Sequence, residues 1–107
     1  MATSKVSGRI VDRKTKDGIA DALIIVLKPG VSTAEFVKQQ KREMALSSVR
    51  SNQDGRFELP DPLPAGLAYS VIVVARDYAD TVLEEAVRIG VDAPAETKLT
   101  PIRLDRT

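Results

Sequence analysis

The sequence predicts an all-β protein: one seven-stranded antiparallel β-sandwich over residues 1–107, with one short helix. Three observations lead to this prediction. Apolar and polar residues alternate with a period of two along most of the chain, turn residues recur at short spacing, and only one segment joins good helix formers to a capping signal. The strands are expected at residues 5–11, 22–27, 45–51, 56–59, 68–76, 81–89 and 96–104.

The first strand and the two most apolar runs form the predicted core. In residues 5–11 the even-numbered positions are apolar or glycine, so one face of this strand is expected to be buried. The dipeptide Asp17-Gly18 then marks a turn. Residues 22–27, ALIIVL, and 68–76, AYSVIVVAR, are apolar on both faces, which is typical of central strands that are covered on both sides.

The one predicted helix spans about residues 33–43. Ser32 and Glu35 have the spacing of a capping box, and the segment that follows contains neither Gly nor Pro. Phe36 and Val37 give this helix an apolar side. Because a two-layer sandwich leaves one apolar face of its central strands outside, we expect the helix to cover part of that face. A neighbouring domain or a second copy would then cover the rest.

Two segments interrupt the strand pattern in the second half of the chain. Residues 60–66, PDPLPAG, hold three prolines and one glycine and are expected to form a loop. In the last strand Leu99 is out of phase with Ile102 and Leu104, and Pro101 between them has no N–H to donate. We therefore expect a bulge or an edge position at this proline.

The composition excludes several classes of function. Without Cys or His the chain has no thiol nucleophile, no Ser-His or Cys-His pair and no imidazole metal ligand. We therefore predict no catalytic, cofactor-binding or metal-binding residues, and a protein that is not an enzyme. The 16 Lys and Arg residues balance 15 Asp and Glu residues without a block of one sign, which argues against nucleic-acid binding. The longest uncharged apolar run, residues 22–27, is too short for membrane insertion.

Residues 51–59, SNQDGRFEL, have two interpretations. A calcium loop of the EF-hand type needs a glutamate six residues after its glycine, but that position is Asp61, which lies between two prolines. Alternatively, Asn52 and Asp54 bond their own backbone in a hairpin turn, and Gly55 takes a positive φ. The turn is the interpretation that the residues favour.

The chain resembles the carboxypeptidase regulatory-like domains over nearly its whole length. The run VSGRIVDRKTKDGIADALIIVL is similar to the opening of that family, where a V-x-G-x-V strand and a turn precede an A-x-V strand. SSVRSNQDGRFELPDPLPAG resembles its T-x-x-D-G-x-F-x-L…L-P-x-G segment, and AYSVIVVARDYAD resembles its Y-x-L-x-V-x-A-x-G-Y segment. Residues 32–45 form an insertion, and Asp77 stands where the family has a glycine.

This resemblance implies a transthyretin-like sandwich of Greek-key topology. It implies a non-catalytic accessory or protein-interaction module in a larger bacterial-type protein, which could be exported and contain a hydrolase. Related sandwiches include a transthyretin-like hydrolase and the intradiol dioxygenases, but both depend on His, which this chain lacks. The Lys-Asn isopeptide cross-link of similar adhesin domains would need Asn52, which is expected in a turn instead.

Carbohydrate binding is the alternative function, since starch-binding domains share a similar sandwich. Sugar recognition depends on exposed aromatic side chains, and Tyr69 and Tyr78 are the candidates that have a polar tip. Under the leading hypothesis the partner is an adjacent domain or another protein. The candidate partner-binding residues are then Lys38, Lys41 and Arg42 on the helix, Leu63 in the Pro-rich loop, and Tyr78.

Overall fold

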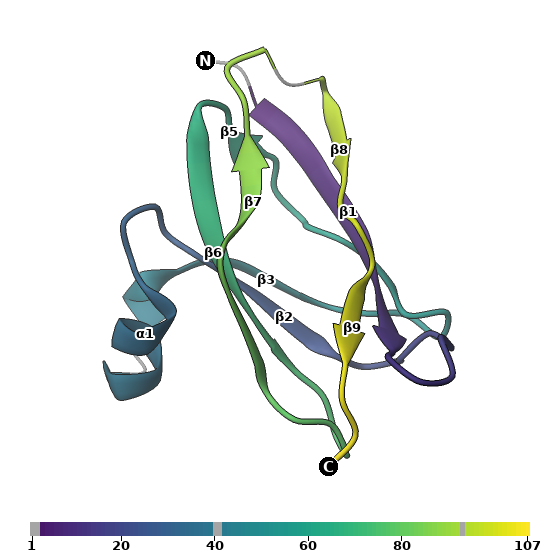
Figure 1. Cartoon of the computed structure of the whole chain (residues 1–107). Helices are drawn as coiled ribbons and strands as arrows, with labels where there is room; N and C mark the ends of the chain where they lie inside the picture. The colour runs from purple at the N-terminus through teal and green to yellow at the C-terminus, as the bar shows by residue number, and fades with distance from the viewer. Residues whose placement is uncertain (1–2, 40–41, 93) are drawn as a thin grey trace.

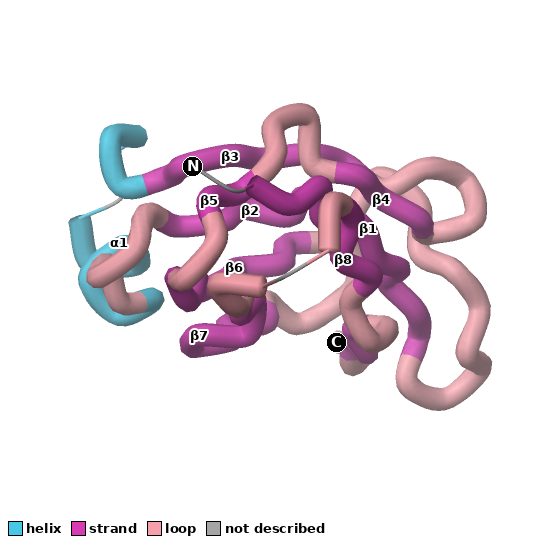
Figure 2. The backbone as a smooth tube through the Cα atoms, turned by 90° about the horizontal axis from the view of Figure 1, so that it is seen from above, coloured by secondary structure: helices cyan, strands magenta, loops and turns pink. Residues whose placement is uncertain are grey.

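The computed structural model describes residues 3–39, 42–92 and 94–107, and it confirms the all-β sandwich. Two sheets pack on each other, and the short helix lies at one side (Figures 1 and 2). The strands are β1 (Thr3–Asp12), β2 (Leu23–Leu27), β3 (Ala45–Arg50), β4 (Arg56–Glu58), β5 (Leu63–Pro64), β6 (Leu67–Val74), β7 (Thr81–Ile89), β8 (Glu96–Lys98) and β9 (Ile102–Leu104). The helical segments are α1 (Thr33–Gln39) and the 3₁₀ turn η1 (Arg42–Met44).

One sheet has four antiparallel strands in the order β3-β2-β6-β7. Its central strands are β2 and β6, as their two-sided apolar character predicts. Ile24 and Val26 of β2 are almost completely buried between the sheets. Leu23 and Ile25 lie on the other face of the same strand and are only half-buried. The side of this sheet that faces away from the core is therefore also apolar.

The other sheet is built around β1. Ser7 of β1 pairs with Glu58 of β4 and also with Lys98 of β8, so these two strands lie along opposite edges of β1. β5 pairs antiparallel with the start of β1, and β9 pairs parallel with its end. β8 and β9 both run parallel to β1, which differs from the fully antiparallel arrangement that the sequence predicts.

The last predicted strand is interrupted at its proline. Leu99 still donates its N–H to the carbonyl of Ser7 at 2.8 Å, but regular pairing resumes only at Ile102. Pro101 lies in this gap and has no N–H for the ladder. The expected interruption is confirmed, and it takes the form of a break between β8 and β9 at the edge of the sheet.

The core lies between the two sheets. Its largest fully buried side chains include Tyr69, Ile10, Ile24, Leu27, Leu63, Ile89 and Leu104. Each aliphatic side chain of this size contributes about 1.5–3 kcal/mol when it leaves water. Gly8 makes room for a large neighbour in this layer, because a Cβ atom there would lie only 2.8 Å from Cζ of Phe57.

The segment SNQDGRFEL contains a turn, which settles its two interpretations. Oδ1 of Asn52 accepts hydrogen bonds from the N–H groups of Asp54 at 2.9 Å and Arg56 at 3.0 Å, and Gly55 has a φ of +78°. The side chain of Asn52 therefore stabilises the turn. The turn does not form a hairpin, however, because β3 and β4 on its two sides belong to different sheets.

The helix begins where the capping signal predicts. The N–H of Glu35 bonds to Oγ of Ser32 at 3.1 Å. The carboxylate of Glu84 in β7 accepts hydrogen bonds from both the N–H and the hydroxyl group of Thr33, which anchors the start of α1 to the sheet. The described part of α1 ends at Gln39, four residues before the predicted end, and residues 40–41 lie outside the described residues.

Candidate interaction groove

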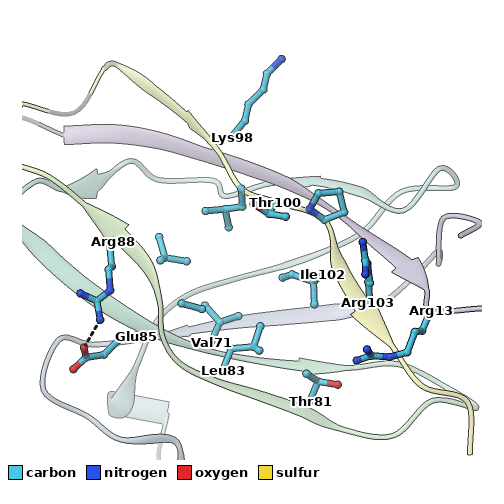
Figure 3. Close-up of a pocket in the computed structure, with 14 residues that line it drawn as sticks. Arg13, Val71, Thr81, Leu83, Glu85, Arg88, Lys98, Thr100, Ile102 and Arg103 are labelled. Atoms are coloured by element: carbon cyan, nitrogen blue, oxygen red, sulfur yellow. Dashed lines mark hydrogen bonds and ion pairs between the residues drawn. The ribbon is translucent and has the colours of Figure 1, made fainter.

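A groove of about 580 Å³ opens between β7 on one side and β8 and β9 on the other (Figure 3). It runs along a seam where no ladder between the described strands joins the two sheets, although a single antiparallel bridge links Tyr78 and Arg106, which are not among the groove residues. In the described part of the chain β7 pairs with β6 alone, while β8 and β9 pair with β1 alone. Unpaired strand edges therefore border the groove from both sheets. Its size falls in the range of ligand-binding sites, about 300–1,000 Å³.

Apolar side chains form the floor of the groove. Leu83 and Val87 come from β7 and Val71 from β6, while Leu99 and Ile102 come from the opposite side. Val71 and Val87 are almost completely buried, whereas the other three are half-buried and accessible from the groove. Figure 3 shows Val71, Leu83 and Ile102 gathered at the centre. This floor can therefore receive an apolar group.

Cationic side chains form the rim. Four of them line the groove: Arg13, Arg88, Lys98 and Arg103. Arg88 pairs with Glu85 at 3.2 Å, and Arg13 pairs with Asp105 at 2.7 Å. Lys98 and Arg103 form no ion pair with another described residue. The rim thus keeps two uncompensated positive charges beside an apolar floor. Exposed ion pairs contribute only about 0–1 kcal/mol, so Arg13 and Arg88 can also change partners at little cost.

A β-bulge shapes the β7 wall of the groove. In the ladder between β6 and β7, residues 84–86 lie opposite Ser70 alone. Glu85 takes a φ of +47°, and its N–H bonds to Oγ of Ser70 at 3.1 Å. Such a bulge bends a strand and increases its local twist. The free edge of β7 is therefore divided into two regular stretches, residues 81–83 and 87–89.

Tyr78, one of the predicted partner-binding residues, belongs to a cluster that joins three segments of the fold. Its hydroxyl donates to the carboxylate of Asp12 at 2.8 Å, and the guanidinium of Arg106 lies 5.4 Å from the centre of its ring. Nε of Arg106 bonds to the same carboxylate at 3.0 Å. The N–H groups of Lys14 and Thr15 donate to Asp12 from the adjacent turn. The polar tip of Tyr78 is therefore engaged within the chain.

These contacts determine the charge states in the cluster. Hydrogen bonds from the N–H of Thr15, the hydroxyl of Tyr78 and the N–H of Lys14 hold the pKa of Asp12 well below its usual range. Burial and the bond to Asp12 raise the pKa of Tyr78. Near neutral pH the carboxylate is ionised and the phenol is protonated. Neither group has the pKa near 7 that suits general acid-base catalysis.

Leu63 departs clearly from the prediction. Its side chain is only 1% exposed and packs in the core, so it is not presented to a partner. The burial of Leu63 draws residues 63–64 alongside β1 as strand β5, in a segment that the prolines predicted to be loop. Tyr69, the other aromatic candidate, is also fully buried, and its hydroxyl bonds to the carbonyl of Pro64 at 2.7 Å.

The helix residues proposed for partner binding are not brought to the groove. Lys38 is exposed in the last turn of α1, and Arg42 begins η1. Lys41 lies outside the described residues. Their role in partner binding stays a prediction.

Helix α1 covers part of the outer apolar face, as expected. It packs against β6 and β7. A shallow hollow of about 540 Å³ lies beside it, with Leu23, Ile25 and Phe36 among its lining residues. Farther along the same face Val74 and Val82 are 38% and 50% exposed. The cover of this face by another domain or a second copy stays a prediction.

The described residues also bear on two other classes of function. No group of three or more acidic side chains gathers among them as a metal site would require. Within the same ranges, no helix has the length and hydropathy needed to cross a membrane.

The groove itself was not predicted from the sequence, because its residues come from four separate segments. Arg13 follows β1, Arg88 lies on β7, and Lys98 and Arg103 flank the proline break. None of these cations stands out from the neighbouring residues in its own segment of the sequence. One available signal was Pro101, which indicates an edge position and therefore a border that another strand does not cover.

Searches with the sequence gave no match to a protein-family model and no match to a curated protein. Comparison of the fold with solved structures did give matches. The C-terminal domain of a shaft pilin from Lactobacillus rhamnosus GG is similar over 100% of both chains, with a TM-score of 0.59 and 12% identity. A chain of a type II cohesin–X-dockerin complex from Acetivibrio cellulolyticus has a TM-score of 0.54 and 20% identity, covering 94% of this chain and 56% of that one.

An enzyme is among the similar structures. The 3-chlorocatechol 1,2-dioxygenase from Rhodococcus opacus 1CP has a TM-score of 0.59 and 15% identity, covering 98% of this chain and 60% of that chain. At such identities the likeness concerns the fold alone. The protein is thus a β-sandwich domain of a kind that occurs in pilins, in a cohesin–dockerin assembly and in a dioxygenase. This chain spans little more than half the length of the complex and dioxygenase chains that it matches.

Proposed function

We propose that this chain is a non-catalytic β-sandwich module that binds another protein or an adjacent domain. The observation that carries the proposal is the groove between β7 and β8–β9. It combines an apolar floor, two uncompensated cations and unpaired strand edges, and these are features through which proteins recognise one another. The similar structures support the same class of function, since one comes from a complex of a cohesin with an X-dockerin and another from a shaft pilin.

The module is proposed to be of the carboxypeptidase regulatory-like, transthyretin-like kind and to belong to a longer protein. The support for the family is the agreement of three sequence segments with its pattern. The support for a longer protein is that similar domains form 30% of a streptococcal ancillary pilin and 48% of a shaft pilin chain. An extracytoplasmic location and a neighbouring hydrolase are proposed from the family resemblance.

Carbohydrate binding has less support. Tyr69 is buried and Tyr78 directs its hydroxyl to Asp12, so neither presents a free aromatic face with a polar tip. The residues that line the groove include no aromatic side chain. Sugar recognition generally needs such a platform. The features of the groove therefore support protein binding better than carbohydrate binding.

Two experiments test the proposed function. An antibody against the domain would be used on fractions of the source cells to read the mass and location of the native polypeptide. We expect a band far above 11.6 kDa in an extracytoplasmic fraction, and a band near 11.6 kDa would contradict the accessory-module part. A photo-reactive residue at exposed Thr100 in the groove should cross-link to a defined partner or to an adjacent domain, and the same group at Asp61 should not.

A further inference from the structure

We propose that the groove binds an extended acidic segment of a partner protein, which adds as a strand beside β7. This inference rests on the proposed function and specifies the chemistry of the partner. In the bound state, alternate side chains of the segment lie on the apolar floor, and the side chains between them carry carboxylates toward the cationic rim. The partner would thereby close the open seam of the sandwich.

The backbone of β7 is the better edge for such pairing. β7 spans nine residues, and its outer edge pairs with no strand in the described part of the chain. The opposite edge is interrupted between β8 and β9, and Pro101 removes a donor there. An added strand lies about 4.8 Å from its neighbour and gains main-chain hydrogen bonds along the edge. The bulge at residues 84–86 restricts regular pairing to the two stretches on either side of it.

The period of a strand matches the distribution of apolar and charged groups around the groove. Successive side chains of a strand point to opposite faces. Inward positions would contact Leu83, Leu99 and Ile102, which are half-buried. Outward positions would lie between the two edges of the groove. Arg88 is exposed at the β7 edge, and Lys98 is exposed at the β8 edge. The segment that fits best therefore alternates apolar and acidic residues.

Charge complementarity selects an acidic segment over a neutral or basic one. The groove is lined by four cations and one carboxylate, Glu85. With Asp105 included as the partner of Arg13, four positive and two negative charges leave a net charge of +2 at this site, although the whole chain has a net charge of only +1. Charges of this kind at a rim mainly set specificity and association rate, and they are screened by salt.

The test uses a blocked peptide of about nine residues, matching the length of β7, in which valine and glutamate alternate. Its binding would be measured by fluorescence anisotropy with a terminal dye. The contact residues would be mapped by changes in backbone amide NMR shifts. We expect saturable binding that weakens as salt rises from about 0.1 M to about 1 M, because the Debye length falls from about 10 Å to about 3 Å. The shift changes should concentrate in residues 81–88 and 98–103.

Two peptide controls separate charge from backbone pairing. A peptide with lysine in place of every glutamate should lose binding at least about tenfold, because the rim then repels it. A peptide with N-methyl groups on all its amides keeps its charge but loses its donors for β7 on both edges, and it should lose binding to a similar extent. Equal binding of the N-methylated peptide would overturn strand addition, and equal binding of the lysine peptide would overturn the acidic specificity.

A matched pair of variants tests the rim in the protein. Lys98→Glu combined with Arg103→Glu should reduce the affinity for the acidic peptide at least about tenfold. Lys28→Glu combined with Arg50→Glu makes the same change in net charge at an exposed lysine and an exposed arginine outside the groove lining, and it should leave the affinity unchanged. Equal losses in both variants would show a general charge effect and overturn the proposal. Circular dichroism and sedimentation would establish that all variants are folded and of equal oligomeric state.

The outcomes distinguish this inference from the function on which it rests. If no acidic peptide binds but Thr100 still cross-links to a defined partner, strand addition is wrong and the interaction function stands. If wild type self-associates and Lys98→Glu with Arg103→Glu abolishes the association, a second copy is the occupant and the acidic partner is wrong. If peptides and the Thr100 cross-linking both fail, the groove-based proposed function falls as well.

Discussion

The hydroxyl of Tyr78 donates a 2.8 Å hydrogen bond to the carboxylate of Asp12, a residue 66 positions earlier in the chain. Asp12 ends β1, and Tyr78 lies in the turn between β6 and β7. The same carboxylate accepts Nε of Arg106 at 3.0 Å. One ionised side chain thus connects the two sheets and the last residues of the chain.

Tyr78→Phe should lower the free energy of unfolding by about 1.5–3 kcal/mol, because it removes a hydrogen bond to a charged group. Urea denaturation monitored by circular dichroism would measure the change. Thr81→Val is a suitable control, since the hydroxyl of Thr81 makes only an exposed 3.3 Å bond to the carbonyl of Ala79. The control should change stability by less than about 0.5 kcal/mol. Equal effects of the two changes would contradict the role of Tyr78.

Acid should destabilise the protein through Asp12 and Glu84, whose pKa values are both lowered by hydrogen bonds in the fold. A carboxyl group whose pKa is lowered by folding binds fewer protons in the folded state than in the unfolded state. The stability of the fold therefore rises with pH between the folded-state pKa and the unfolded-state pKa of that group. Its contribution is complete above the unfolded pKa, about 3.9 for Asp and about 4.3 for Glu. That contribution is lost as the pH falls from there toward the folded pKa.

Thermal unfolding across the acid range would measure this dependence. Asp12→Asn removes one of the two titrating groups, so its midpoint should fall less steeply with decreasing pH than that of wild type. Thr81→Val, which removes no ionisable group, should keep the wild-type slope. Parallel curves for Asp12→Asn and wild type would show that Asp12 is not the group responsible.

Gly55→Ala should destabilise the protein by about 2–4 kcal/mol. Its φ of +78° disfavours a side chain, and an added Cβ atom would collide with the backbone of Ile10. Gly30→Ala is the matched control, because Gly30 has a similar φ of +84° but no atom within 4 Å of the added Cβ. The control should cost only about 1 kcal/mol. Equal losses of stability in the two variants would contradict the close contact between Gly55 and the backbone of β1.

Glu84→Gln should loosen the start of helix α1. The carboxylate of Glu84 accepts hydrogen bonds from the N–H and hydroxyl groups of Thr33, and it also accepts one from Oγ of Ser70 at 3.1 Å. An amide can accept these bonds through only one oxygen and without the charge. Hydrogen exchange should therefore accelerate in residues 33–39, while residues 67–74 stay protected. Glu85→Gln, which changes an exposed ion pair, should leave the exchange of α1 unchanged. Unchanged exchange in Glu84→Gln would refute the anchor.

Local pattern was sufficient to predict most strands, but it could not predict how they pair. The apolar runs of β2 and β6 identify central strands, and the phase change at Pro101 identifies a break, because both are properties of neighbouring residues. The parallel pairing of β8 and β9 with β1 depends on contacts across about 90 positions, which alternation does not encode. The prolines around Leu63 predict a loop, but this segment forms the buried strand β5. Its pairing with the distant strand β1 is also not visible in the local sequence.

Candidate site residues were harder to predict than the fold. The polar tip of Tyr78 makes it a candidate for ligand binding, but that tip bonds to Asp12, whose position in space the sequence does not show. The rim cations of the groove lie in separate segments, and their common location depends on the order of the strands in each sheet. Residues that act together in such a site share no local pattern, so composition and spacing cannot reveal them.

The central position of β1 in its sheet has a consequence for biosynthesis. Among the described residues, β4, β5, β8 and β9 all pair with β1, and none of them pairs with another. Within this domain β1 is synthesised before all four of these partners, so its pairing is complete only after β9 has been made. At about 5–20 residues per second that interval is roughly 5–20 seconds. During this time one edge of an apolar strand is exposed to chaperones and to other nascent chains. Ribosome-bound intermediates of this protein should accordingly be most prone to aggregation until β9 has emerged.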